Sequence, residues 1–443
     1  MSISPTSGGG TQFVRSNAPC IAAPGRVCLP HSRDGEARTR PDRVRDAWAM
    51  SRVFRWLLIT FVESFATTLI ERGLYFYSQN VLAFSNAENL WLALGFGAPY
   101  AIGALVSHPL SRRIPEKHLL AFSIVGQLAG HLVLFAWPGG HVLVPVNTML
   151  GLLNGLKWPF IESYVNAGQT PSEAARSVGR FNVSWITAVF IGLVVAGPII
   201  DLWPRGNFGL AAALNVITLW LMRPVDRRAI HLPADHPERP TPVALERLRA
   251  LLLSSRWTMF MSYALMWILV AILPDIFAKL LVPVTVSPAM SGLLDIIRGV
   301  TFVGLQFYTG WHNRRLPLAL AMIGIPLGFF LTIFGSSLAA VLVGEVLFGA
   351  AAGMAYYAAL YYAMVVKNAA VDAGGAHEGL IGSGFAVGPL MGLLGVALAP
   401  SLGSRLGGML VGVGPLVVVC VAGATWVLAR ARRRVLAEGG GKV

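Results

Sequence analysis

The chain has 443 residues, of which 55% are hydrophobic and only 13% are charged. Soluble globular proteins have about 25% charged residues, so this composition argues strongly against a water-soluble fold. The net charge of +14 raises the question of a nucleic-acid partner, which the positions of the basic residues answer below.

Residues 1–54 form a polar tail that is rich in Gly, Pro, Ser and Arg and has no apolar periodicity. This composition is typical of disordered segments, and the tail lacks the apolar core of a signal peptide. We therefore expect a disordered cytoplasmic tail before the first apolar segment.

Apolar stretches follow along the rest of the chain, each close to the roughly 20 residues that a helix needs to cross a bilayer. Their continuous apolar character favours helices over a barrel, whose strands would alternate in polarity. The first six spans are predicted at 55–82, 89–110, 118–137, 142–166, 179–202 and 206–223. The second six are predicted at 257–281, 288–311, 316–335, 337–366, 377–401 and 406–430.

The charged, proline-rich range 224–256 separates these two sets and is predicted to be a cytoplasmic linker. The sequence therefore predicts an all-α integral membrane protein with twelve transmembrane helices in two pseudo-symmetric six-helix bundles. These bundles comprise residues 55–223 and 257–430, and a short cytoplasmic tail (431–443) follows them.

The distribution of Lys and Arg predicts the orientation, because these residues are retained on the cytoplasmic side of short loops. With the N-terminus inside, the cytoplasmic side receives almost all basic residues, and the opposite side receives only Arg205, Lys279 and Arg405. Both termini are therefore expected in the cytoplasm of a cell (inner or plasma) membrane. Because the basic patches flank helices, lipid is the expected partner and nucleic acid is not.

Several features recur about 200 positions apart, which indicates an internal repeat. Arg112-Arg113 after the second span corresponds to Arg314-Arg315 after the eighth. The fourth and tenth spans carry the glycine pairs Gly151/Gly155 and Gly349/Gly353. The fifth and eleventh spans carry Gly197-Pro198 and Gly388-Pro389. A kink with close helix packing explains such pairs at least as well as a role in transport.

With twelve spans, a long central linker and a basic loop after the second span, residues 55–430 resemble the major facilitator superfamily. That family's loop runs Gly-x-x-x-Asp-Arg-x-Gly-Arg-Lys, and here Gly103 and the pair Arg112-Arg113 match while the aspartate is absent. The resemblance implies alternating access between two bundles. It also implies gating roles for the basic pair and for the Gly-Pro pairs Gly197-Pro198 and Gly388-Pro389.

Ionisable residues inside apolar spans are functional candidates because a charge is costly in the bilayer. In the first bundle these are Glu63, Glu71 and Arg72 of span one and Lys157 of span four. We expect Lys157 to pair with Glu71, and Tyr75 to lie one turn beyond Glu71 on the same face. The cluster is either the proton-coupling site or a salt bridge that only joins two helices.

The second bundle carries Asp295 and Arg298, three residues apart and able to pair on one helix face, and Glu345 in span ten. Asp275 and Lys279 are expected to form a surface pair or a gate latch. Structural roles are expected for the remaining ionisable residues at the cytoplasmic helix ends: Glu162, which lies close to Arg176 and Arg180 in the sequence, and His377 with Glu378.

A second similarity is to the proton-coupled oligopeptide transporters of the same superfamily. Their first-span Glu-x-x-Glu-Arg followed by aromatics is similar to Thr68-Leu-Ile-Glu71-Arg72 with Tyr75, Phe76 and Tyr77. Lys157 after a glycine-rich run and Gly344-Glu345 also match. The resemblance implies that Glu71, Arg72 and Lys157 couple transport to protons and that Glu345 contacts a substrate amine.

The predicted function is secondary transport of a small solute, driven by protons through Glu71, Arg72, Lys157 or Glu63. Candidate substrate contacts are Tyr75, Trp158, Asp295, Arg298, Glu345 and Tyr357. A non-transporting sensor or scaffold remains an alternative, and so does a membrane enzyme, although the common catalytic motifs are absent. We expect a functional monomer without a cofactor or metal, and no ATP-driven pump because no phosphate-binding loop occurs.

Overall fold

The computed structural model describes residues 40–169, 171–229, 242–367 and 371–439, and these form helices and no strand. Residues 1–39, most of the predicted disordered tail, lie outside the described residues. Ala49–Val443 form one compact unit that contains both predicted bundles.

The N-terminal half consists of α1 to α7 and the C-terminal half of α8 to α14. In the first half the bounds are α1 (Arg40–Glu71), α2 (Gly73–Leu82), α3 (Asn86–Ser111), α4 (Glu116–Ala136), α5 (Gly140–Asn166), α6 (Pro171–Leu202) and α7 (Gly206–Leu221). In the second they are α8 (Pro242–Lys279), α9 (Ser287–Ser291), α10 (Leu293–Phe307), the 3-10 turn η1 (Thr309–Trp311), α11 (Leu316–Phe334), α12 (Leu338–Lys367), α13 (Val371–Leu398) and α14 (Arg405–Gly439).

Every predicted span coincides with a helix or a pair of consecutive helices. Ten helical segments of the described chain are long and apolar enough to cross a membrane. The two other spans are α7, which is apolar but shorter, and α5, which has 27 residues but carries Asn147, Asn154, Lys157 and Glu162 on largely buried faces. The fold is therefore the predicted all-α membrane protein with twelve spans.

Two spans are interrupted where the sequence analysis expected continuous helices. Span one breaks between α1 and α2 at Arg72, and span eight breaks between α9 and α10 at Gly292. The first break lies at the cavity described below, which Arg72 lines, and the second lies three residues before Asp295, another lining residue. A break in a helix leaves backbone N–H and C=O groups without helical partners, which a membrane protein tolerates where it encloses a solvated space.

Several helices extend beyond the predicted spans, and three of them reach into the predicted tails or linker. α1 begins at Arg40 inside the predicted tail, α8 begins at Pro242 inside the predicted linker, and α14 continues to Gly439. A helix that is already nucleated in the bilayer gains one hydrogen bond for each added residue, so it continues into polar sequence until a breaker occurs. Proline is well tolerated at the first position of α8 because that N–H has no helical partner.

The outward-facing surface of Ala49–Val443 is apolar, as lipid contact requires. Large side chains such as Phe122, Leu320 and Val418 are more than half exposed. Exposed tryptophans lie near helix ends, with Trp91, Trp137 and Trp203 at one end of the helices and Trp220 and Trp426 toward the other. This distribution matches the aromatic belts of membrane proteins.

The predicted internal repeat corresponds to equivalent packing in the two halves. A Cβ on Gly151 of α5 would lie 2.2 Å from the carbonyl oxygen of Phe96 on α3. A Cβ on Gly349 of α12 would lie 2.4 Å from the carbonyl oxygen of Leu294 on α10. Span four therefore packs on span two as span ten packs on span eight, through glycines that bring the backbones together.

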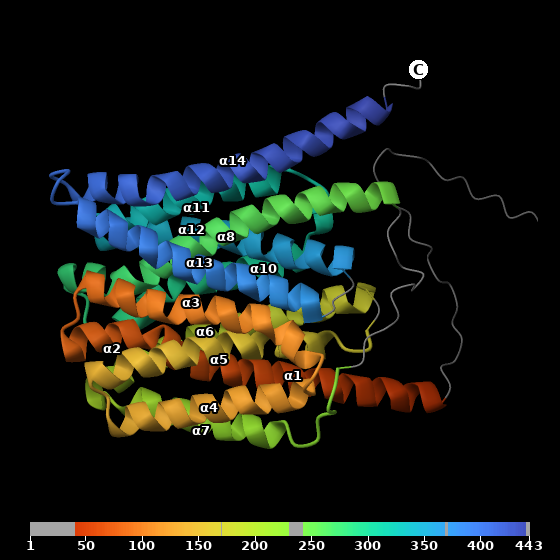
Figure 1. Ribbon diagram of the computed structural model, residues 1–443, viewed down its shortest axis with the longest axis horizontal. Helices are drawn as coiled ribbons and strands as arrows, with labels where there is room; N and C mark the ends of the chain where they lie inside the picture. The colour runs from red at the N-terminus through yellow and green to blue at the C-terminus, as the bar shows by residue number, and fades with distance from the viewer. Residues whose placement is uncertain (1–39, 170, 230–241, 368–370, 440–443) are drawn as a thin grey trace, which may run out of the picture. The chain divides into compact units, whose positions relative to one another are not determined.

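The two halves meet mainly through α3 against α13 and through α6 against α9 and α10. In Figure 1, α3 and α13 lie side by side at the boundary between the warm-coloured and cool-coloured halves. We call the end where α8 begins and α14 ends the linker end, and the opposite end the far end. The basic loops 112–113 and 314–315 lie at the linker end, as predicted.

Candidate functional site

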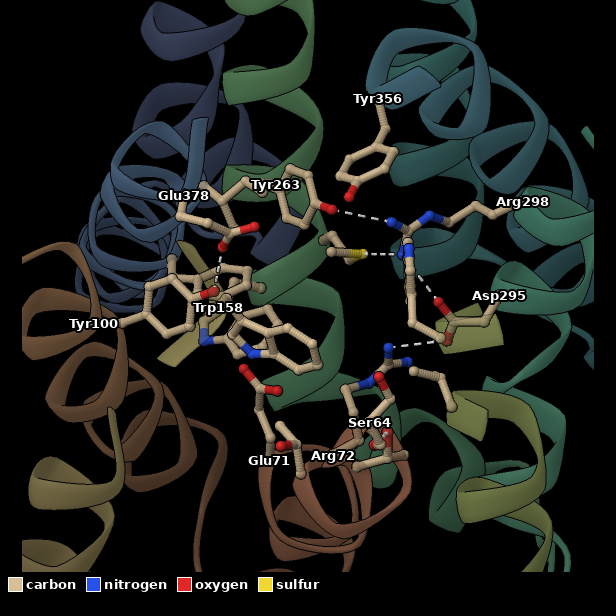
Figure 2. Close-up of a pocket in the computed structure, with 18 of the residues that line it drawn as sticks. Ser64, Glu71, Arg72, Tyr100, Trp158, Tyr263, Asp295, Arg298, Tyr356 and Glu378 are labelled. Carbon is tan, nitrogen blue, oxygen red and sulfur yellow. Dashed lines mark hydrogen bonds and ion pairs between the residues drawn. The ribbon is translucent and has the colours of Figure 1, made fainter. Parts of the chain in front are cut away.

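A cavity of about 110 Å³ lies between the two halves (Figure 2). The N-terminal half contributes Ser64, Thr67, Thr68, Glu71, Arg72, Tyr100, Trp158, Phe181, Trp185 and Val189. The C-terminal half contributes Tyr263, Met266, Trp267, Asp295, Arg298, Tyr356, Glu378, Ile381 and Phe385. A mostly apolar and aromatic lining with a few convergent charges is typical of a small-molecule site.

One wall of the cavity is an ion network that crosses the boundary between the halves. Arg72 contacts Asp295 at 2.9 Å, and Arg298 contacts the other carboxylate oxygen of Asp295 at 3.0 Å. Asp295 is completely buried. The predicted pair of Asp295 and Arg298 is therefore present, and the structure adds Arg72 of the opposite half to it.

Arg298 is also held by aromatic side chains. Its guanidinium donates to the hydroxyl of Tyr263 at 3.1 Å and lies 5.0 Å from the centre of the Trp185 ring. Two guanidinium groups share one carboxylate here, so this wall carries a net positive charge. Cation–π contacts of this kind fix a guanidinium in one orientation without neutralising it.

The opposite wall is acidic and aromatic. Glu71 lies against the cavity, and no hydrogen bond or ion pair to another described residue is found for its carboxyl group. Glu378 accepts a short hydrogen bond from Tyr100. In Figure 2, Glu71, Tyr100, Trp158 and Glu378 lie toward the left of the view, across the cavity from Asp295 and Arg298 at the right.

Lys157 does not pair with Glu71, which corrects the expectation from the sequence. Its ammonium contacts Glu63 at 2.8 Å and also reaches Thr67 at 3.0 Å and Gln127 at 3.1 Å. An ammonium has three protons to donate, and this position gives each of them an acceptor. A buried charge is stable only when it is paired and hydrogen-bonded in this way.

The Lys157 network lies entirely within the N-terminal half. Asn215 donates to the second oxygen of Glu63 at 3.2 Å and contacts His131 at 2.8 Å. Glu63 and Lys157 are both completely buried and do not line the cavity. The four predicted coupling residues thus divide into Glu71 and Arg72 at the cavity, and Glu63 and Lys157 behind it.

Of the predicted substrate contacts, Trp158, Asp295 and Arg298 line the cavity, whereas Tyr75, Tyr357 and Glu345 are not among the lining residues. Tyr75 and Tyr357 are buried in the hydrophobic core. Glu345 is completely buried, and neither carboxyl oxygen has a hydrogen-bond partner in the described part of the chain.

Two carboxylates expected to have structural roles near the helix ends are buried close to the cavity instead. Glu378 lines it, and Glu162 forms a side-chain hydrogen bond with Glu378 rather than meeting Arg176 or Arg180, which are exposed. The sequence analysis also missed Tyr100. For Glu378 the missing signal was the helix boundary, because α13 begins at Val371 and places this residue two turns inside the helix.

The predicted gating residues occupy different environments. Arg112 and Arg113 are exposed in the loop after α3 at the linker end, and Arg112 contacts His108 at 3.1 Å. A Cβ on Gly197 of α6 would lie 2.4 Å from the carbonyl oxygen of Thr285, across the boundary between the halves.

The second Gly-Pro pair lies within one half. A Cβ on Gly388 of α13 would lie 2.0 Å from the carbonyl oxygen of Ala264 on α8. Pro198 and Pro389 each follow their glycine inside a helix. Of the two glycines, Gly197 therefore packs against the other half and Gly388 packs within its own half.

Two related helical halves that enclose a charged cavity within an apolar, lipid-compatible exterior define a membrane transporter. Residues 49–369 match the family profile of the Major Facilitator Superfamily, which is more than half of the chain. The chain belongs to this superfamily.

Solved structures of transporters have the same fold. A bacterial homologue of the human lysosomal transporter Spinster, crystallised in an inward-facing and unoccupied conformation, has a TM-score of 0.62 and 15% identity, covering 86% of this chain and 97% of that chain. A mutant of the nucleoside transporter NupG has a TM-score of 0.59 and 14% identity, covering 85% and 99%. No curated protein sequence matches significantly.

Proposed function

We propose that this chain is a proton-coupled secondary transporter that moves a small polar solute by alternating access, with Glu71 as the proton-carrying residue. The observation that carries the proposal is the position of Glu71. Its carboxyl group borders a cavity between the two halves and has no ion-pair partner in the described chain, while the adjacent Arg72 is bound to Asp295 of the other half.

Contacts between the halves exist at both ends of the cavity, as alternating access requires. At the far end, Asn86 of α3 donates to Asp275 of α8 at 2.7 Å. At the linker end, Gly374 of α13 lies against Glu162 of α5. Rocking of one half against the other would open one set of contacts while the other set remains closed.

Glu71 is suited to follow this movement. Its carboxyl group lies at the cavity between the halves and next to Arg72, which is bound to the other half, so its surroundings would change when the halves move. Opening toward an acidic compartment would protonate Glu71, and opening toward the opposite compartment would release the proton. Glu63 is the less favoured carrier, because Lys157 and Asn215 already satisfy its carboxylate.

The charges of the cavity favour a polar solute over a purely apolar one. An apolar solute would remove water from Glu71 and from the wall of Arg72 and Arg298 without replacing its hydrogen bonds. We place the protein in a cell membrane as a monomer with the linker end in the cytoplasm, because the basic loops at that end would be retained there.

The substrate is first sought by thermal stabilisation of the purified protein with a panel of peptides, sugars, organic anions and drugs. A stabilising compound is then used in proteoliposomes with the Glu71→Gln variant. We expect this variant to lose accumulation driven by a proton gradient while it retains exchange between equal pools, because exchange requires alternation but no net proton movement.

Glu88→Gln is the matched control, since Glu88 is an exposed carboxylate at the start of α3, and it should accumulate substrate normally. Full gradient-driven accumulation by Glu71→Gln would refute the assignment. A sensor or scaffold, or an enzyme, is indicated instead if the wild-type protein binds a compound from the panel but neither exchanges nor accumulates it.

A further inference from the structure

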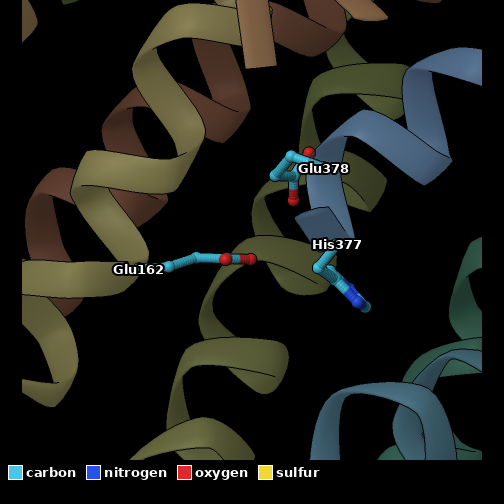
Figure 3. A group of neighbouring side chains, drawn as sticks. All are labelled: Glu162, His377 and Glu378. Carbon is cyan, nitrogen blue, oxygen red and sulfur yellow. The ribbon is translucent and has the colours of Figure 1, made fainter. Parts of the chain in front are cut away.

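Glu162, His377 and Glu378 form a cluster at the linker end (Figure 3). Each residue offers one ligand atom, and these three atoms all lie within 4.8 Å of one another. Glu162 belongs to α5, whereas His377 and Glu378 are consecutive in α13. The cluster therefore joins side chains of the two halves, from positions more than 200 residues apart.

The polar atoms of this cluster are buried and incompletely satisfied. Glu162 is 7% exposed, His377 0% and Glu378 5%. Neither ring nitrogen of His377, nor Oε1 of Glu162, has a hydrogen-bond partner in the described chain. Buried polar groups are almost always paired, so an unpaired imidazole beside two carboxyl groups requires an explanation.

The two carboxyl groups of the cluster lie against each other. Glu162 and Glu378 share a side-chain hydrogen bond, which requires a proton on one of them. The described ion pairs include no cationic partner for either group. A cation bound among the three side chains would take the place of that proton and give the unpaired imidazole and Oε1 of Glu162 a partner.

We propose that Glu162, His377 and Glu378 bind a divalent transition-metal cation that joins α5 to α13. One imidazole nitrogen and two carboxylate oxygens form a ligand set that suits Zn²⁺, Mn²⁺, Fe²⁺ or Co²⁺ better than Ca²⁺ or Mg²⁺. Tyr100 donates a hydrogen bond to Glu378 and would orient this carboxylate as an outer-shell partner. The metal would displace the shared proton.

Metal binding requires a small local contraction. Ligand atoms around Zn²⁺ are separated by roughly 3–3.5 Å, given bonds of about 2.0–2.2 Å in a tetrahedral site. The present separations of up to 4.8 Å would close by side-chain rotation. Because α5 and α13 belong to different halves, the bound ion would hold the linker end closed. This role is independent of the proposed proton transfer by Glu71.

No metal site was predicted, because the spacing of possible ligands along the sequence matches no common metal-binding motif. Here the ligands come from two helices, and only the fold places Glu162 beside the pair 377–378. The adjacent positions of His377 and Glu378 do not form the usual helical ligand pair, in which ligands are three or four residues apart.

The test is titration of the purified full-length protein with Zn²⁺ in the presence of a competing chelator. We expect one saturable equivalent, a rise in Tm with Zn²⁺, and an X-ray absorption spectrum with one imidazole and oxygen ligands. Glu162→Gln, His377→Gln and Glu378→Gln should each weaken binding at least tenfold.

Two control variants should bind Zn²⁺ as the wild type does. Glu345→Gln removes another buried carboxyl group without hydrogen-bond partners, and His118→Ala removes an exposed histidine. The proposal is overturned if folded wild-type protein binds no saturable Zn²⁺, or if the spectrum lacks an imidazole ligand. The spectrum is measured on the wild type alone, so it tests the proposal even if the cluster variants do not fold. If the cluster variants fold and bind Zn²⁺ with the affinity of the wild type, the proposal is also overturned.

Discussion

The two buried ion networks of this protein differ in what they join. Lys157 and Glu63 lie within the N-terminal half, where the ammonium group of Lys157 has an acceptor for each of its three protons. Arg72 and Asp295 join the N-terminal half to the C-terminal half beside the cavity. Under the proposed alternating access, the first network would move with one half, while the second lies at the boundary where one half would move against the other.

This difference assigns separate roles to residues that look alike in the sequence. A charge enclosed within one bundle contributes to its rigidity, since breaking the pair leaves an uncompensated ion in a dry environment. A charge pair between bundles adds to the stability of one conformation only, and its loss shifts the equilibrium between conformations. Stability and transport measurements should therefore separate the two networks.

The largest effect is expected for Lys157→Ala. The substitution leaves Glu63 as a buried carboxylate, and we expect a loss of about 3–5 kcal/mol of stability. Thermal unfolding of the detergent-solubilised protein measures it. The double variant Glu63→Gln/Lys157→Gln removes both charges and should be more stable than the sum of the single changes predicts. Additive losses would show that the pair is not coupled.

A smaller loss of stability, together with loss of transport, is expected for Asp295→Asn. Arg298 retains Tyr263, and Arg72 borders the cavity, so we expect about 1–3 kcal/mol. A double-mutant cycle with Arg72→Gln should show a coupling of about 0.5–3 kcal/mol between the halves. A coupling indistinguishable from zero would mean that the pair does not join them in the membrane.

The smallest change in stability is expected for Asp275→Asn at the far end. Its partner Lys279 is 55% exposed, so the pair contributes less than about 1 kcal/mol. The variant also weakens the contact of Asn86 with residue 275 across the halves, which should favour opening of the far end. A cysteine at Ser64, in a background without the three native cysteines, should then react faster with an impermeant reagent added from outside. Unchanged labelling would argue against a latch at this end.

The sequence predicted many of the residues at the site, but it did not predict which of them contact each other. Charges within apolar spans predicted that Glu63, Glu71, Arg72 and Lys157 matter, because such residues are too costly in a bilayer to occur without a reason. The partner of Lys157 was predicted wrongly. Helical periodicity specifies which residues share a face, but it does not decide which of the two carboxylates of span one, Glu63 or Glu71, an ammonium on a flexible stem reaches.

Contacts between the halves could not be predicted from the sequence. Arg72 and Asp295 are separated by 223 positions, and nothing in their local pattern selects this pairing. The same holds for Glu162 with Glu378. The helix α13 begins early enough to place Glu378 in the cavity lining, which a hydropathy-based boundary at residue 377 could not show.

The sequence by itself determined the fold class and the twelve spans, because hydropathy and the lysine and arginine distribution act locally through the bilayer. It also determined the repeat, since glycines that allow close helix packing recur at equivalent positions. Only the tertiary structure decided which charges meet and which face the cavity. Those contacts depend on how the two halves are packed together, and no periodicity within one helix encodes that packing.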